Sequence, residues 1–151
     1  MTSTVNMQRR KLLAAGVALA VTSPAFATRE EMAAAISTFT GGAAPQAGKV
    51  KLEVATLVDN GNAVPISVTV ESPMTASEHV VAIAIFNERN PQTDVVTFTL
   101  GPRSGKALVS TRIRMATSQK LTVVARMSDG SFWTSSADVI VTLAACIEGE
   151  G

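Results

Sequence analysis

Residues 121–143, LTVVARM-SDGS-FWTSSADVIVTL, decide the fold of this chain. The segments Leu121 to Met127 and Phe132 to Leu143 are rich in β-branched and aromatic residues, which strands favour. Between them, Ser128 to Ser131 contains an Asp-Gly pair, a strong signal for a tight turn between two strands. The stretch therefore predicts an antiparallel β-hairpin.

Five segments N-terminal to this hairpin also indicate strands. Residues 49–54 alternate polar and apolar side chains, as a half-buried strand does, whereas 79–86 is almost wholly apolar, as in a strand buried on both faces. In residues 107–115, the odd positions from Val109 to Met115 share one face and the even positions share the other. Strands are also expected at 64–70, where Pro65 requires a strand start or a sheet edge, and at 95–100. About seven short strands at regular spacing predict an all-β fold, an antiparallel β-sandwich.

One short helix is expected before the strands, at residues 29–36. Thr28 can cap its N-terminus, and Glu30 and Glu31 lie in the first turn, where the helix dipole favours negative charge. The glycine- and proline-containing stretch 41–45 ends it.

The first 27 residues have the pattern of an export signal. Arg9 and Arg10 form a twin-arginine pair, a short apolar run follows, and Ala25-Phe26-Ala27 is an A-x-A cleavage site. The apolar run of about ten residues is too short for the ~20 that cross a bilayer. The pattern predicts cleavage after Ala27, a periplasmic protein without a membrane segment, and three regions: the signal 1–27, a β-sandwich domain 28–143 and a C-terminal arm 144–151.

Removal of the signal changes the charge balance. Three of the 13 basic residues, Arg9, Arg10 and Lys11, lie in the signal, which leaves 10 basic against 12 acidic residues, formally −2. Nucleic-acid binding requires a basic face, so this partner class is excluded. About 124 residues remain, enough for a single hydrophobic core.

Residues suited to enzyme chemistry are few. His79 is the only histidine and Cys146 the only cysteine, and the carboxylates occur singly along the strands and turns. Acid–base and nucleophilic catalysis require several such groups together, so no catalytic residue, metal site or cofactor is predicted. His79 is interpreted as a solvated residue at a strand start, and Phe132 and Trp133 as core or interface packing.

Cys146 remains as the residue that carries chemistry. It is the sixth residue from the chain end, which is a poor place for a core residue and an accessible place for another protein. A single cysteine in an exported protein is a free thiol, an intermolecular disulfide or an attachment point. Because reactivity usually decides where cysteines are kept, a reactive thiol is favoured over an inert one.

Six stretches in a fixed order carry a resemblance to a known family. They are GGAAP (41–45), GKVKL (48–52), DNGNAVP (59–65), FNERNP (86–91), STRIR (110–114) and MSDGSFW (127–133). The chain after the signal resembles, over essentially its whole length, the SoxY family, the sulfur-substrate carrier subunits of the periplasmic thiosulfate-oxidising (Sox) system.

The resemblance implies an immunoglobulin-like sandwich that pairs with a SoxZ-like subunit to form a heterodimer. It also implies that Cys146 is the covalent attachment site for sulfur intermediates, presented on a flexible C-terminal arm. The partner enzymes would be a c-type cytochrome complex that joins thiosulfate to the thiol, a hydrolase that releases sulfate, and a sulfur dehydrogenase. The chain itself would not be an enzyme.

The arm departs from the family pattern. The family cysteine lies in a Gly-Gly-Cys-Gly-Gly tail, whereas here Ala144 and Ala145 precede Cys146 and Ile147 and Glu148 follow it. Only Gly149 and Gly151 remain as glycines. Side chains narrow the conformational range of the arm, and nearby carboxylates disfavour the thiolate and repel anionic substrates.

Several functions therefore stay open on sequence alone. Cys146 can still carry sulfur with a restricted set of partner enzymes, or the chain can be a divergent relative whose carrier role is changed. A third possibility is a non-carrier periplasmic interaction module in which Cys146 is incidental or forms only a covalent dimer. A stand-alone enzyme is disfavoured because no acid–base or metal constellation is present.

Overall fold

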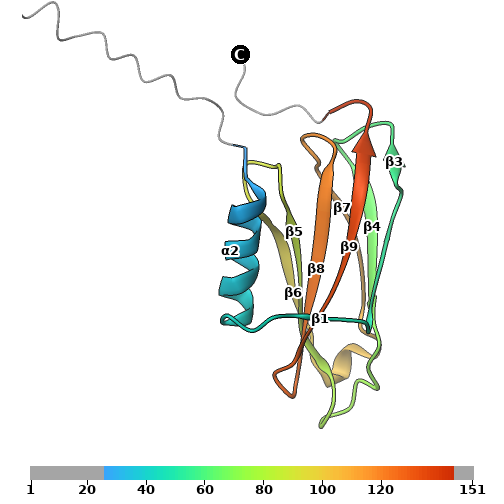
Figure 1. Ribbon diagram of the computed structural model, residues 1–151. Coiled ribbons are helices and arrows are strands. Elements are labelled where there is room, and N and C mark those ends of the chain that lie inside the picture. Colours follow the sequence, from blue (N-terminus) through green and yellow to red (C-terminus); the bar gives the residue numbers. More distant parts are fainter. Residues whose placement is uncertain (1–25, 145–151) are drawn as a thin grey trace, which may run out of the picture.

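Seven antiparallel strands of five to ten residues build two facing sheets in the computed structural model, which describes residues 26–144. The larger sheet contains, in spatial order, β9 (Phe132–Val141), β8 (Gln119–Met127), β5 (Val80–Asn87) and β6 (Asp94–Thr99). The smaller sheet contains β2 (Val50–Val54), β4 (Val64–Val70) and β7 (Leu108–Ile113). Figure 1 shows these two layers with one helix outside the larger sheet. The predicted sandwich of about seven strands is confirmed.

The core lies between the sheets because inward-facing side chains alternate along each strand. Val64, Ile66 and Val68 of β4 face Ile83 and Ile85 of β5 in one cluster. This cluster also includes residues of β8 and β9 and residues beyond the strand ends, among them Leu121, Val123, Val139, Met115 and Met127. The predicted alternation in 107–115 is confirmed, since Ile113 and Met115 are buried and the even positions 110, 112 and 114 are exposed.

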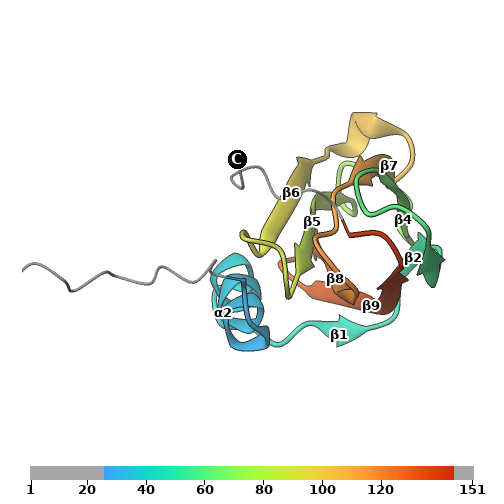
Figure 2. The same cartoon turned by 90° about the horizontal axis from the view of Figure 1, so that it is seen from above.

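Strand β5 is buried on both faces, as its apolar sequence predicts. Ile83 and Ile85 belong to the core between the sheets, whereas Ala84 and Phe86 belong to a second cluster on the outer face. That second cluster is covered by helix α2 (Arg29–Thr40), which contributes Met32. Figure 2 shows the helix packed against the outside of the larger sheet.

Helix α2 is four residues longer than the predicted 29–36. Its N-terminus has the expected cap: the Thr28 hydroxyl accepts from the Glu31 amide at 3.2 Å, and the Glu31 carboxylate accepts from the Thr28 amide at 2.8 Å. Its C-terminus is Gly41 in the left-handed conformation, φ 65°. The additional turn forms because Phe39 packs between Phe86 and Phe132, with both pairs of ring centroids 6.0 Å apart.

Two short strands were not predicted, and both are parallel to their partner. β1 (Gln46–Ala47) and β3 (Leu57–Val58) pair with the first and last parts of β9. The sandwich is therefore not purely antiparallel. Two-residue strands carry no periodicity, so only the position of the β9 edge in the fold creates them.

The strand that contains Pro65 is central in its sheet, between β2 and β7. Pro65 is its second residue, and the pairing with β2 ends one position later, at Ile66 opposite Val54. The missing N–H therefore removes no bond to β2. Of the two predicted options, the strand start is confirmed and the sheet edge is wrong.

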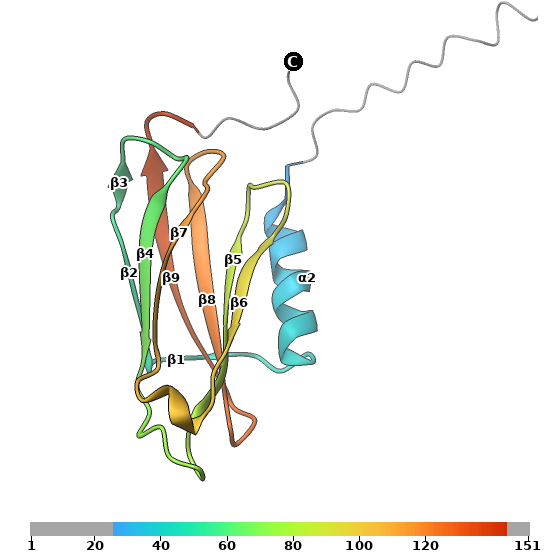
Figure 3. The same cartoon turned by 180° about the vertical axis from the view of Figure 1, so that it is seen from behind.

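The remaining boundaries differ from the predictions by at most two residues. The hairpin at 119–141 turns through Gly130, φ 83°, as the Asp-Gly signal predicts. A short 3-10 helix, η1 (Pro102–Ser104), joins β6 to β7, and Figure 3 shows this connection at the lower end of the sandwich. No helix within residues 26–144 is long and apolar enough to cross a membrane. The expected export signal lies almost wholly outside the described residues.

Candidate functional site

The predicted site residues fall at the boundary of the described chain. Ala144 is the last described residue and is exposed, outside any helix or strand. Cys146 and its predicted arm neighbours Ala145, Ile147, Glu148 and Gly149 lie outside the described residues. The structure thus defines the segment from which the arm leaves, residues 142–144, which we call the arm root.

The arm root is fixed to the loop that follows β3. The Leu143 carbonyl accepts from the Gly61 amide at 2.8 Å, and the Thr142 amide donates to the Val58 carbonyl at 3.0 Å. The Thr142 hydroxyl also donates to the Asp59 carbonyl at 3.2 Å. The backbone is therefore held up to the residue before Ala144.

A second loop holds the end of β9 from the side of β8. The Ser118 hydroxyl accepts from the Val141 amide at 2.8 Å. In the same loop the Met115 amide donates to the Gly61 carbonyl at 2.8 Å, which links it to the first loop. Backbone amides in this region are satisfied by loops of both sheets, so the arm starts from a well-defined position.

Asn90 connects a third loop to this end of the sandwich. Its side-chain carbonyl accepts from the Ala116 amide at 2.9 Å and from the Gln119 side chain at 2.8 Å, and its amide nitrogen donates to the Arg114 carbonyl at 2.7 Å. Its backbone carbonyl accepts from the Ala27 amide at 3.1 Å. The first residues of the described chain and the arm root therefore lie at the same end, as Figure 1 shows.

Sequence reasoning did not identify Ser118, Asn90 or Gln119 as supports of the arm. A signal for Asn90 was present, because it belongs to FNERNP, one of the stretches that resemble a known family. Three of those stretches, 59–65, 86–91 and 110–114, reach this end of the sandwich. These three stretches therefore lie at the same end of the sandwich as the arm root.

The opposite end of the sandwich is held by Trp133. The Lys49 ammonium lies 4.9 Å from the centre of its ring, and the ring lies 3.4 Å from the position of a Cβ at Gly48, whose φ is 115°. The indole N–H donates to the Ser131 hydroxyl at 3.1 Å. These contacts tie β1 and the start of β2 to β9, so Trp133 packs rather than forming an open binding platform.

Asp129 and His79 also lie at this opposite end. The pKa of Asp129 is lowered from 3.8, because the Ser131 hydroxyl and then the Ser131 amide donate to its carboxylate, at 2.6 and 2.9 Å. His79 precedes β5 and is half-buried, with Nδ1 3.0 Å from the Thr75 carbonyl. β5 separates His79 from the loops that hold the arm root.

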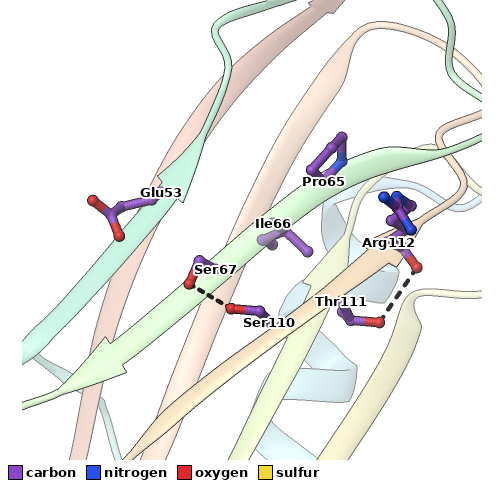
Figure 4. A pocket seen from close by; sticks show the side chains of 7 residues that line it. All are labelled: Glu53, Pro65, Ile66, Ser67, Ser110, Thr111 and Arg112. Atoms are coloured by element: carbon purple, nitrogen blue, oxygen red, sulfur yellow. Dashed lines mark hydrogen bonds between the residues drawn. The ribbon is translucent and has the colours of Figure 1, made fainter.

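A shallow cavity of about 680 Å³ lies on the outer face of the smaller sheet. Figure 4 shows its lining, in which the Ser67 and Ser110 hydroxyls are hydrogen-bonded at 2.8 Å. Glu53 at one side is paired with Lys51 at 2.8 Å, and Arg112 lies at the other. These groups do not form a metal site: within residues 26–144 no three histidine, cysteine or acidic residues are grouped to hold an ion.

Comparison with known proteins decides the family. A family model described as "Sulfur oxidation protein SoxY" matches residues 36–146. The chain belongs to the SoxY family. The match covers more than two thirds of the chain and ends at Cys146, so it includes the arm root.

Solved structures support this membership. The sulfur carrier protein SoxY from Chlorobium limicola f thiosulfatophilum is similar over 72% of this chain and 89% of its own, with 27% identity and a TM-score of 0.60. The family and this neighbour together support a sulfur-carrier role in the Sox system and a SoxY-type immunoglobulin-like sandwich. The family is a component of the periplasmic Sox system, and a carrier role is consistent with a protein that is not itself an enzyme.

Other solved structures share only the fold. The superoxide reductase (neelaredoxin) from Ignicoccus hospitalis is 16% identical, with a TM-score of 0.56 over 76% of this chain and 94% of its own. The superoxide reductase from Nanoarchaeum equitans is 10% identical, with a TM-score of 0.53 over 64% of this chain and 100% of its own. A search of curated proteins found no match.

Proposed function

We propose that this protein holds sulfur intermediates covalently on Cys146 and presents them to partner enzymes. The observation that supports this proposal most directly is that the family match extends to residue 146, the only cysteine of the chain. Cys146 follows the hydrogen-bonded Leu143 by three residues, and an extended chain spans at most about 3.5 Å per residue. A fixed root and a short tail suit a group that must be delivered to different active sites.

The proposed chemistry balances with external partners. Attachment joins the Cys146 sulfur to the outer sulfur of thiosulfate, which forms an S–S bond and releases one proton and two electrons to the cytochrome complex. Hydrolysis then adds water across the bond to the terminal sulfone, which leaves as sulfate, while a persulfide remains on Cys146. Further oxidation of that sulfur by the dehydrogenase requires electron acceptors that the partner supplies.

The domain contributes position rather than reactivity to these steps. Within the described residues, the single histidine lies at the end opposite the arm root, and no metal-binding group is present. A carrier needs neither, because the enzymes that it visits supply the acid, the base and the redox centre. The family match, and not this arrangement, is what favours a carrier over a stand-alone enzyme.

We extend the proposal to assembly and location. The heterodimer partner is a SoxZ-like subunit, and the heterodimer serves the cytochrome complex, the sulfate-releasing hydrolase and the sulfur dehydrogenase. The Arg9-Arg10 signal sends the chain to the periplasm through the twin-arginine pathway, which transports folded proteins. Export of the folded heterodimer, in which the partner has no signal of its own, would explain why this chain carries a twin-arginine signal.

To test the proposal, the mature protein is purified from periplasm and its intact mass is measured before and after reduction. We expect additions of sulfur or of thiosulfate on the wild type, removed by reductant and mapped to Cys146. The Cys146→Ser variant, matched in size, should carry none while retaining its partner subunit. An unmodified thiol after incubation with thiosulfate and the cytochrome complex would reject the carrier function and favour the non-carrier interaction module.

A further inference from the structure

Three large aliphatic side chains are exposed near the segment from which the arm leaves the domain. Leu57 is 58% exposed, Ile140 is 59% exposed and Leu143 is 61% exposed. Leu57 of β3 and Ile140 of β9 are direct partners in the parallel register, so their side chains share one face. Leu143 follows Ile140 by three residues. We call these three residues the root patch.

The exposure of the root patch is not a general property of this sheet face. Val139 and Val141, on either side of Ile140, turn inward and pack in or against the core. Earlier along β9, Phe132 is covered by Phe39 of α2, and Ser136 and Asp138 are polar. The uncovered apolar surface on β9 is therefore confined to the end beside the arm root.

The seven residues that follow Ala144 include an apolar side chain that could cover the apolar root patch. Their sequence is Ala-Cys-Ile-Glu-Gly-Glu-Gly, in which Ile147 is the only large apolar residue. Ile147 is four residues past Leu143, and four residues span at most about 14 Å. Neighbouring strands lie about 4.8 Å apart, so Leu57 and Ile140 are both within that reach. A tail that turns back at the root can place Ile147 on the patch.

We propose that Ile147 docks on the root patch and anchors the arm to its own domain. Burial of Ile147 against Leu57 and Ile140 removes apolar surface from water on both sides of the contact. The inference deepens the proposed function, and its biological meaning rests on Cys146 being the carrier thiol.

Methyl-group NMR of the mature, reduced protein tests the contact directly. We expect nuclear Overhauser effects between the δ1 methyl of Ile147 and the methyls of Leu57. Deletion of residues 145–151 should shift the Leu57 and Ile140 methyl signals and leave Leu108 unchanged, which is a 50% exposed leucine on the smaller sheet. Absence of the Overhauser effects together with unshifted patch signals would overturn the proposal.

A nitroxide spin label attached to Cys146, the only cysteine, reports how far docking of Ile147 restricts the motion of the arm. We expect Ile147→Gly and Leu57→Ser each to lower the ratio of immobilised to mobile label about three- to tenfold, the range for partial burial of one isoleucine. The double variant should add little to either single variant, because both remove the same contact. Leu108→Ser is the matched control and should leave the ratio unchanged.

Other occupants of the root patch give different results. If a second copy covers it, the Overhauser effects appear between differently labelled chains and weaken on dilution. If the SoxZ-like subunit covers it, Leu57→Ser weakens assembly and leaves label mobility unchanged. Either result overturns intramolecular docking. None of these measurements uses sulfur cargo, so a failure here leaves the mass-spectrometric test of the carrier function intact.

Discussion

Within the described chain, both ends of the sandwich are held by hydrogen bonds, but only the end opposite the arm adds a packed aromatic ring. At the arm end, the loops that contain Gly61, Asn90 and Ser118 fix the chain through directional hydrogen bonds. At the opposite end, the Trp133 ring packs against Gly48 and Lys49. Hydrogen bonds define where a backbone lies, whereas apolar packing mainly supplies stability. We therefore expect substitutions at the opposite end to cost more stability, because they remove apolar packing as well as hydrogen bonds.

The largest effect is expected from Trp133→Ala at the packed end. Loss of a half-buried ring, its cation–π contact and its bond to Ser131 should lower the free energy of unfolding by about 3 kcal/mol. Urea denaturation measures this change. Trp133→Phe, which keeps an aromatic ring, should lose less. Sulfur loading of Cys146 should persist while the variant is folded, and its loss would show that the two ends are coupled.

Asn90→Ala is expected to cost less stability and to affect the arm end more. It leaves the Ala116 amide without its acceptor and removes one of the two acceptors of the Gln119 side-chain amide, which should lower the free energy of unfolding by about 2 kcal/mol. Hydrogen exchange at the Ala116 and Met115 amides should accelerate. Gln92→Ala is the control, because Gln92 is exposed and makes no hydrogen bond within the described chain. Equal effects of the two variants would contradict the role of Asn90.

Ser118→Ala tests the support of β9 itself. The Val141 amide loses its acceptor, so we expect a loss of about 1 kcal/mol. Exchange of that amide should accelerate more than exchange of the Val123 amide in the middle of β8. Ser135 lies on the same strand as Val141, and Ser135→Ala removes a hydroxyl for which no hydrogen bond is described, so it should change neither quantity. A similar response in both variants would mean that Ser118 is not a specific support.

The smallest effect is electrostatic and lies at the packed end. Because the pKa of Asp129 is lowered in the fold, its carboxylate stabilises the protein above the ordinary value of 3.8, and this contribution is lost as the pH falls through the lowered value. Asp129→Asn should therefore be slightly less stable than the wild type at neutral pH. The difference should shrink in acid, as measured by urea midpoints across the pH range. A difference that grows in acid would reverse the assigned sign.

Much of the fold was predictable because its long strands carry strong periodicity. β8 and β9 with their Asp-Gly turn, and β5 with its apolar run, follow directly from residue types. The Thr28 cap follows from local chemistry between residues three apart. In each case the interaction that decides the structure is local or repeats along one strand.

The supports of the arm were not predictable in the same way. Asn90 bonds to Ala116 and Gln119 across 26 and 29 residues, and Ser118 bonds to Val141 across 23. β1 and β3 exist only because an edge of β9 is available to them. An isolated polar residue is not part of a periodic sequence pattern, so its hydrogen-bond partner more than 20 residues away cannot be predicted from the sequence.

By itself, the sequence determined the all-β class, the helix cap and the identity of the one thiol, because residue type and local spacing are sufficient for these. Only the tertiary structure decided that the loops containing Gly61, Asn90 and Ser118 meet at the arm root, and that Leu57 and Ile140 lie side by side beside it. Such juxtapositions depend on how the sheets pack and pair. That packing is a property of the whole chain and of no single segment.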